Sequence, residues 1–103
     1  MKTSELTGAQ LDWAVAKCEG IYFEDLEDFE HSAPDYSDWA QGGPIIEREH
    51  IGIDWTGFEV WEAWDDKAMP ASRYTGPTPL IAAMRCYVAS KLGDEVELPK
   101  ELV

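Results

Sequence analysis

The chain has 103 residues, and its 21 acidic side chains outnumber the 8 basic ones, which gives a formal net charge of -13 at pH 7. Such a charge repels the phosphates of nucleic acids and the head groups of anionic membranes, so we do not expect direct nucleic-acid or membrane binding. Five Trp, four Tyr and three Phe argue against disorder of the whole chain. The length predicts a single domain, residues 1–103, with one modest core.

Targeting signals and metal motifs are missing from the sequence. No apolar run approaches the roughly 20 residues of a membrane-spanning helix, and the N-terminus lacks the apolar core of a signal peptide. Cys18 and Cys86 are too far apart in sequence for a zinc knuckle, and each falls at a small-residue position of a predicted helix. We expect buried thiols there, and we predict no metal site and no cofactor.

The first third of the chain combines a helix pattern with an acidic run. A helix is predicted over Gly8–Cys18, with Thr7 or Thr3 as its cap and a glycine as its stop. The following segment, 21–29, begins with the alternating and aromatic residues of a strand. The acidic run Glu24–Glu30 overlaps it and does not match the spacing of a calcium-binding loop. We therefore predict an exposed acidic edge or loop at this run.

Segment 34–50 contains a glycine pair followed by Pro44, and it has two interpretations. In the first, Pro44 opens a short helix that continues through position 50. In the second, Ser37 or Asp38 caps a longer helix that runs through the glycines. We favour the short helix, because Gly and Pro weaken a helix interior.

A β-hairpin is predicted after position 50. Ile51, Ile53 and Trp55 alternate, a Thr-Gly turn follows, and apolar residues alternate again over Phe58–Trp64. An amphipathic helix over Phe58–Trp64 is the competing interpretation. The residues from 65 to 75 include proline and small side chains and are predicted to form a loop.

The clearest pattern of the chain is a helix over Pro79–Leu92. Thr78 is the expected N-cap, Pro79 fits the first helical position, and Gly93 fits the end. Arg85 is the one charge in the middle of this helix. We expect its stem to lie at the edge of the apolar stripe with its head in water, and a ligand or partner contact is the sharper interpretation.

Helix, strand, short helix, hairpin and long helix in this order predict an α+β fold. The expected architecture is a small antiparallel sheet with an N-terminal helix, a short central helix and a long C-terminal helix packed on it. The sequence contains no internal repeat and no low-complexity linker that would divide it.

Three blocks of the sequence, LTGAQLDWAVAKCEG, YSDWAQGGPIIEREHI and GPTPLIAAMRCYVASKLGDEVELP, resemble in this order the NinX-like family of small tailed-phage proteins. The blocks cover about half the chain and leave out the acidic segment 21–31 and the hairpin. The family resembles a wider set of phage proteins with a helix–sheet–helix sandwich. The resemblance implies a phage or prophage accessory protein that acts in the host bacterial cytoplasm, and it carries over no catalytic residues.

The residues themselves give no sign of catalysis. The sequence contains no nucleophile elbow, no Walker loop, no dinucleotide fingerprint, no CxxC and no HExxH. Its histidines are His31 and His50, and the neighbouring Glu47, Glu49 and His50 form a pattern that is common on solvated helix faces. We predict that the protein is not an enzyme.

Our leading functional prediction is counter-defence by sequestration of a nucleotide-like small molecule. Aromatic rings would stack on a base, while arginines and the N-terminus of the last helix would hold an anion. The predicted ligand-binding residues are Tyr36, Trp39, Gln41, Gly43, Arg48, Tyr74, Thr78 and Arg85.

The alternative prediction is an acidic inhibitor or adaptor that covers a basic surface of a host enzyme. Its interface would consist of the acidic run Glu24–Glu30 and exposed aromatic side chains, and charge would steer the encounter. Salt distinguishes the two, because charge-steered protein binding weakens steeply with ionic strength and a stacked nucleotide less so. A homo-oligomer is also compatible with so many aromatic residues in a small domain.

Overall fold

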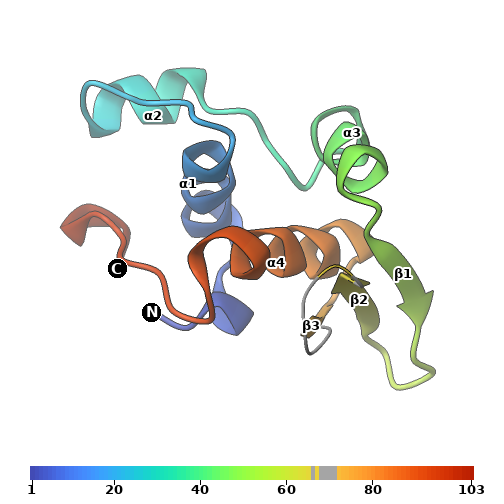
Figure 1. Ribbon diagram of the computed structural model, residues 1–103. Helices are drawn as coiled ribbons and strands as arrows, with labels where there is room; N and C mark the ends of the chain where they lie inside the picture. The colour runs from blue at the N-terminus through green and yellow to red at the C-terminus, as the bar shows by residue number, and fades with distance from the viewer. Residues whose placement is uncertain (66, 68–71) are drawn as a thin grey trace.

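The computed structural model describes residues 1–65, 67 and 72–103. Three antiparallel strands form one sheet in the order β1-β2-β3, and α4 packs on it (Figure 1). The helices α1 and α3 pack in turn against α4. The predicted α+β class is confirmed. In chain order the helices and strands are α1 (Gly8–Cys18), α2 (Leu26–Ser32), α3 (Trp39–Glu49), β1 (Gly52–Trp55), β2 (Trp61–Asp65), β3 (Ser72–Gly76) and α4 (Pro79–Leu92).

The helix α4 begins and ends where the sequence predicts. The Thr78 side chain accepts a hydrogen bond from the Ile81 backbone N–H at 3.1 Å, and Gly93 ends the helix with a φ of 88°. Its close approach to the sheet depends on Gly76, where a Cβ would lie 2.7 Å from the backbone nitrogen of Ala82. Every residue from Ala82 to Val88 is buried, so both the apolar stripe and the small-residue face lie in the core.

Arg85 differs from its expected position at the edge of the helix. Its side chain is only 8% exposed. Nε donates to the carbonyl of Leu6 at 3.0 Å, and Nη1 donates to the carbonyl of Thr75 at 2.7 Å. The expectation of a head in water was therefore wrong. The guanidinium ties the N-terminal segment to β3 across α4, and burial lowers the pKa of Arg85.

The helix α3 follows the longer of the two interpretations, so the preferred short helix from Pro44 was wrong. The Asp38 side chain caps the helix by accepting from the Ala40 N–H at 3.2 Å. The helix then continues through both glycines and Pro44 to Glu49. Tertiary packing explains why: a Cβ on Gly42 would lie 2.6 Å from the Leu80 side chain. The glycine that weakens the isolated helix lets it lie close against α4.

The hairpin prediction is confirmed, and the competing helix over Phe58–Trp64 was wrong. Strands β1 and β2 pair in register, with Ile53 opposite Ala63 and Trp55 opposite Trp61. The predicted loop over 65–75 misses β3, which pairs with β2 over Ser72–Gly76. The rest of that predicted loop, residues 66 and 68–71, lies outside the described residues.

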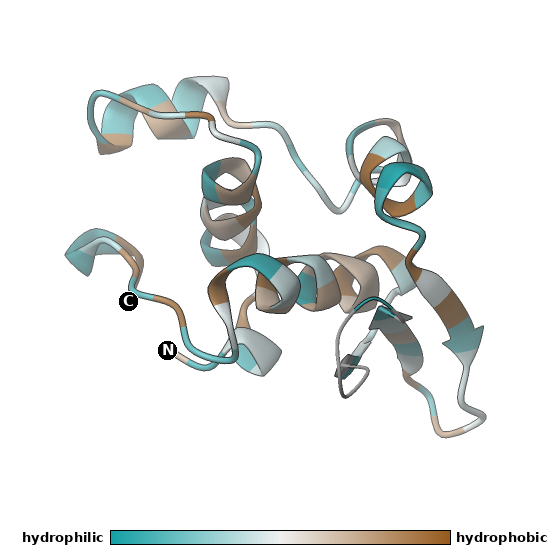
Figure 2. Cartoon of the chain, in the orientation of Figure 1, coloured by the Kyte–Doolittle hydropathy of each residue, from teal (hydrophilic) through white to brown (hydrophobic). Residues whose placement is uncertain are grey.

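The strand predicted over 21–29 was also wrong, and the acidic run is not a sheet edge. Asp25 caps α2 by accepting from the Asp28 N–H at 2.8 Å, and acidic side chains in a first turn favour a helix. Most residues of this helix are hydrophilic (Figure 2). Phe29 is its buried residue, and the Phe23 ring meets it edge to face with centroids 5.2 Å apart.

The two ends of the chain lie side by side (Figure 1). The Val96 N–H donates to the carbonyl of Met1 at 2.8 Å, and the N-terminal amino group donates back to the carbonyl of Val96 at 3.0 Å. Among the described residues, no helix combines the length and the apolar character needed to cross a membrane.

Candidate functional site

The predicted ligand-binding residues around the start of α3 have mixed surroundings. Trp39 is 56% exposed, and Gln41 is also exposed. Gly43 lies beside the Trp39 ring, because a Cβ there would be 3.7 Å from that ring. Tyr36, by contrast, is 4% exposed and belongs to the hydrophobic core. One exposed ring with its neighbouring amide is therefore available to a base, and the second ring is not.

Arg48 at the end of α3 is held by carboxylates. Its Nη2 and Nη1 donate to Glu19 at 2.6 and 3.1 Å, and its Nε donates to Glu49 at 2.9 Å. Nη2 also donates to the Tyr87 hydroxyl at 3.2 Å. These bonds join α1, α3 and α4, and the hydrogen bond from Arg48 lowers the pKa of Glu19. An anionic ligand would have to displace Glu19 before it reached this guanidinium.

The last three predicted residues are engaged near the sheet and α4. Tyr74 on β3 packs against the core, and burial raises its pKa. The Thr78 hydroxyl is used as the cap of α4, and the Arg85 guanidinium binds two backbone carbonyls. The predicted ligand-binding residues therefore do not form one site, because several of them already have structural roles.

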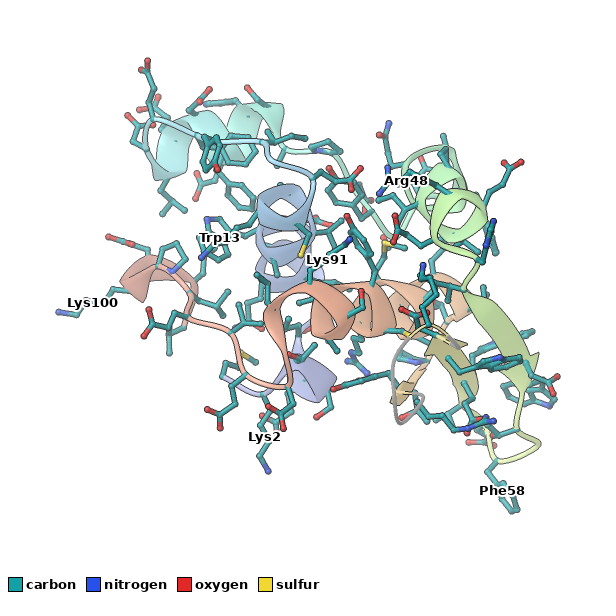
Figure 3. All side chains as sticks on the ribbon, in the orientation of Figure 1. Lys2, Trp13, Arg48, Phe58, Lys91 and Lys100 are labelled. Carbon is teal, nitrogen blue, oxygen red and sulfur yellow. The ribbon has the colours of Figure 1, made fainter. Side chains whose placement is uncertain are left out.

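An apolar cleft of about 490 Å³ lies between α1, the segment 21–29 and the C-terminal turn, which Lys100–Leu102 form. We call it the aromatic cleft. Trp13 reaches into this region from α1 (Figure 3). Tyr22 is 86% exposed at its border. The volume falls within the range of small-ligand and side-chain pockets. The cleft is lined by Trp13, Lys17, Ile21, Tyr22, Phe23, Asp25, Leu26, Phe29, Pro99 and Glu101.

A second, open hollow adjoins the aromatic cleft and shares Tyr22 and Asp25 with it. Its other lining residues are Glu24, Glu27, Asp28 and His31, and we call this surface the acidic rim. Asp25 and Asp28 hydrogen-bond within α2, while Glu24 and Glu27 are exposed. No ion pair of the described residues involves either glutamate. Their charges are therefore available to a partner.

Residues 2–91 match the model of the family described as Bacteriophage P22, NinX. The chain belongs to this family. The match includes the acidic segment and the hairpin, which lie outside the three sequence blocks. No curated protein matches the chain in sequence. Membership makes the chain a phage protein and supports an accessory role.

In this NinX-family chain, Lys17 is the basic side chain of the aromatic cleft. Its ammonium group lies over the Trp13 ring, 5.1 Å from the centroid. Within the part of the chain that the structure describes, no carboxylate pairs with it. Because the same cleft contains Asp25 and Glu101, its lining is net acidic.

The chemistry available to the thiols and carboxylates is limited. Burial raises the pKa of Cys18 to about 11 and that of Cys86 to about 12, so both thiols are protonated at neutral pH and are poor nucleophiles. Among the described residues, no three His, Cys, Asp or Glu side chains are grouped to hold a metal ion.

The sequence indicated parts of this site separately. Trp13 flanks the apolar stripe of the first helix, and the acidic run is evident from composition. The contribution of Pro99 and Glu101 has no local signal, because these residues are brought to α1 only by the fold. The Gln10 side chain, which donates to the carbonyl of Leu102 at 2.7 Å, holds the C-terminal turn there.

Proposed function

We propose that this NinX-family protein is a phage accessory protein that binds a basic segment of another protein at the aromatic cleft and the acidic rim. The observation that carries the proposal is the contact between the two surfaces, which share Tyr22 and Asp25. An apolar anchor of the partner enters the cleft, and lysine or arginine side chains next to that anchor meet Glu24 and Glu27.

Each surface has a separate role in recognition. Burying one leucine or phenylalanine side chain of the partner contributes about 1.5–3 kcal/mol. Exposed charge pairs contribute little individually, but they steer the encounter and select basic sequences. The net charge of -13 extends this steering over the whole molecule. We therefore expect a weak, transient complex, because one such anchor and a few exposed charge pairs supply less than the roughly 8 kcal/mol of micromolar binding.

Sequestration of a nucleotide-like molecule remains a prediction with less support from the geometry. Arg48 and Arg85 already bind carboxylates and carbonyls, and Tyr36 is buried. The exposed Trp39 and Gln41 are the parts of that site that a ligand could reach. We further propose that the protein is not an enzyme, that it acts in the host bacterial cytoplasm, and that inhibition of a host defence protein is its role.

The proposal is tested by titrating the full chain with a labelled amphipathic peptide. The peptide carries leucine and phenylalanine on one helical face and lysine elsewhere, and fluorescence anisotropy reports binding at low and high salt. We expect binding that weakens with salt. Tyr22→Ala removes an exposed cleft residue and should weaken binding about tenfold.

The rim has a matched control within the same segment. Glu24→Gln combined with Glu27→Gln should weaken binding several-fold and reduce the salt dependence. Glu30 is exposed on α2 but does not line the rim, so Glu30→Gln should leave the affinity unchanged. If Glu30→Gln weakens binding as much as Glu27→Gln does, the attraction is non-specific and the proposal is wrong. Absence of binding at low salt would also overturn it.

A further inference from the structure

The tip of the β1–β2 hairpin exposes large aromatic side chains. Phe58 is 84% exposed and Trp55 is 48% exposed. The Trp55 and Trp61 rings lie 5.3 Å apart, centroid to centroid. Phe58 points away from the rest of the molecule at the end of the hairpin (Figure 3). Trp61 is half-buried against the core, and we call the exposed Trp55 and Phe58 side chains the aromatic tip.

The loop that presents Phe58 is held by its own hydrogen bonds. The Thr56 hydroxyl donates to the carbonyl of Val60 at 2.8 Å and accepts from the Phe58 N–H at 3.1 Å. Glu59 has a φ of 63°, a left-handed conformation that is unfavourable for a residue other than glycine. The loop therefore accepts backbone strain and keeps Phe58 outside the core. Because Phe58 is exposed, its burial within this chain does not offset the backbone strain at Glu59.

The charges beside the aromatic tip define the surface that would cover it. Asp54 and Glu59 are exposed, and no ion pair of the described residues includes them. The nearby Glu62 is already neutralised by an ion pair with Arg73. The complementary surface is an apolar recess with lysine or arginine at its border. A second copy, with the same net charge of -13, and an anionic membrane are both repelled.

We propose that the aromatic tip is a second docking point, with Phe58 inserted into an apolar recess of a protein that has a basic border. The β1–β2 hairpin and the helix α2 lie at opposite ends of the molecule, whose longest dimension is 38 Å (Figure 1). Both surfaces can therefore be occupied at once, and the chain can bridge two proteins or two sites of one. The residues of the tip are different from those of the cleft, so the inference about the tip and the proposed function of the cleft can be disproved independently.

The test places a photoreactive residue at the tip of the full chain. Phe58→benzoylphenylalanine is expressed in the bacterial host during infection, and illumination cross-links whatever covers position 58. The cross-linked protein is then identified, purified and titrated with the unmodified chain. We expect the cross-link to lie on a basic surface, and we expect Phe58→Ala to weaken binding at least tenfold.

The controls separate this inference from the cleft and from misfolding. Phe58 is exposed, so Phe58→Ala should melt at the wild-type temperature. Glu30→Gln lies outside the cleft, the rim and the tip, and it should leave the affinity for the cross-linked protein unchanged. Equal affinity of Phe58→Ala and wild type would overturn the inference. So would a cross-link to a second copy only, or no cross-link at all. Phe58-dependent co-sedimentation with phosphatidylglycerol or phosphatidylcholine vesicles would identify a membrane contact instead.

Discussion

The region around α4 differs from the region around α2 in how many of its polar and apolar side chains have partners within the chain. Around α4, even the charged Arg85 is buried and bonded to two carbonyls. Around α2, Tyr22 is 86% exposed and the acidic side chains face solvent. The side chains around α4 form a core, whereas exposed apolar and charged side chains lie side by side around α2.

This difference separates residues that hold the fold from residues that are free to bind. Among the described residues, no buried side-chain nitrogen or oxygen lacks a hydrogen-bond partner. Polar groups in the interior are therefore already used, whereas Glu24 and Glu27 at the α2 end make no ion pair within the described part of the chain. Substitutions around α4 should change stability, whereas substitutions at the cleft, the rim and the tip should change binding.

The largest expected effect is the loss of the Arg85 guanidinium. Arg85→Met keeps an apolar stem but removes the donors to Leu6 and Thr75, so we expect the free energy of unfolding to fall by about 3 kcal/mol in urea denaturation. Arg73→Met on the exposed sheet surface is the matched control and should change stability by less than about 1 kcal/mol. A similar, small change in both variants would show that the buried Arg85 guanidinium does not hold the fold together.

Alanine substitutions at the glycine pair of α3, Gly42 and Gly43, should have intermediate effects of opposite sign on the free energy of unfolding. Gly42→Ala places a methyl group 2.6 Å from Leu80 and 2.7 Å from the carbonyl of Tyr36, and it should cost about 2 kcal/mol. At Gly43 the nearest atom, on the Trp39 ring, is 3.7 Å away. Gly43→Ala should therefore stabilise the helix by about 0.5–1 kcal/mol. Thermal unfolding measures both, and a destabilised Gly43→Ala would contradict this packing.

The smallest expected effect depends on pH and concerns Asp12 on α1. Burial raises the pKa of Asp12 from 3.8 to about 6, despite the hydrogen bond that it accepts from the Tyr36 N–H. A raised folded-state pKa favours the protonated form, so its contribution to stability is full below pH 3.8 and is lost as the pH rises through about 6.

Asp12→Asn should therefore stabilise the protein above about pH 6 and have little effect near pH 4. Because the side chain is partly exposed, we expect a gain of about 1 kcal/mol rather than the full value of the shift. Denaturation at several pH values measures it. A gain that is independent of pH would show that the charge of Asp12 is not its cause.

Strong local signals explain what the sequence predicts well. The cap Thr78, Pro79 and the terminal Gly93 define α4, and the alternation with a Thr-Gly turn defines the hairpin. The predicted start of α3 was wrong because Gly42 lies in close contact with Leu80, a tertiary contact that no local sequence rule detects. The sequence analysis missed the helix α2 because its capping residue, Asp25, lies inside an acidic run that resembles an exposed sheet edge.

The candidate site shows the same limit. Exposed aromatics and acids are visible in the sequence as residue types, but their meeting at one cleft depends on the path of the chain between Trp13 and Glu101. The arginines mislead in the opposite direction. Arg48 and Arg85 have the chemistry of anion binding, and only the fold reveals that Glu19 and two carbonyls already occupy them.

The central claim, that this chain binds a basic partner at the aromatic cleft and acidic rim, is tested most directly by NMR. Amide spectra of the full chain are recorded during titration with the basic amphipathic peptide and, separately, with ATP. We predict that the peptide shifts amide resonances of residues 13–29, 100 and 101 and that ATP shifts none of them. Shifts at Tyr36, Trp39 and Arg48 with ATP, without any response to the peptide, would contradict the claim.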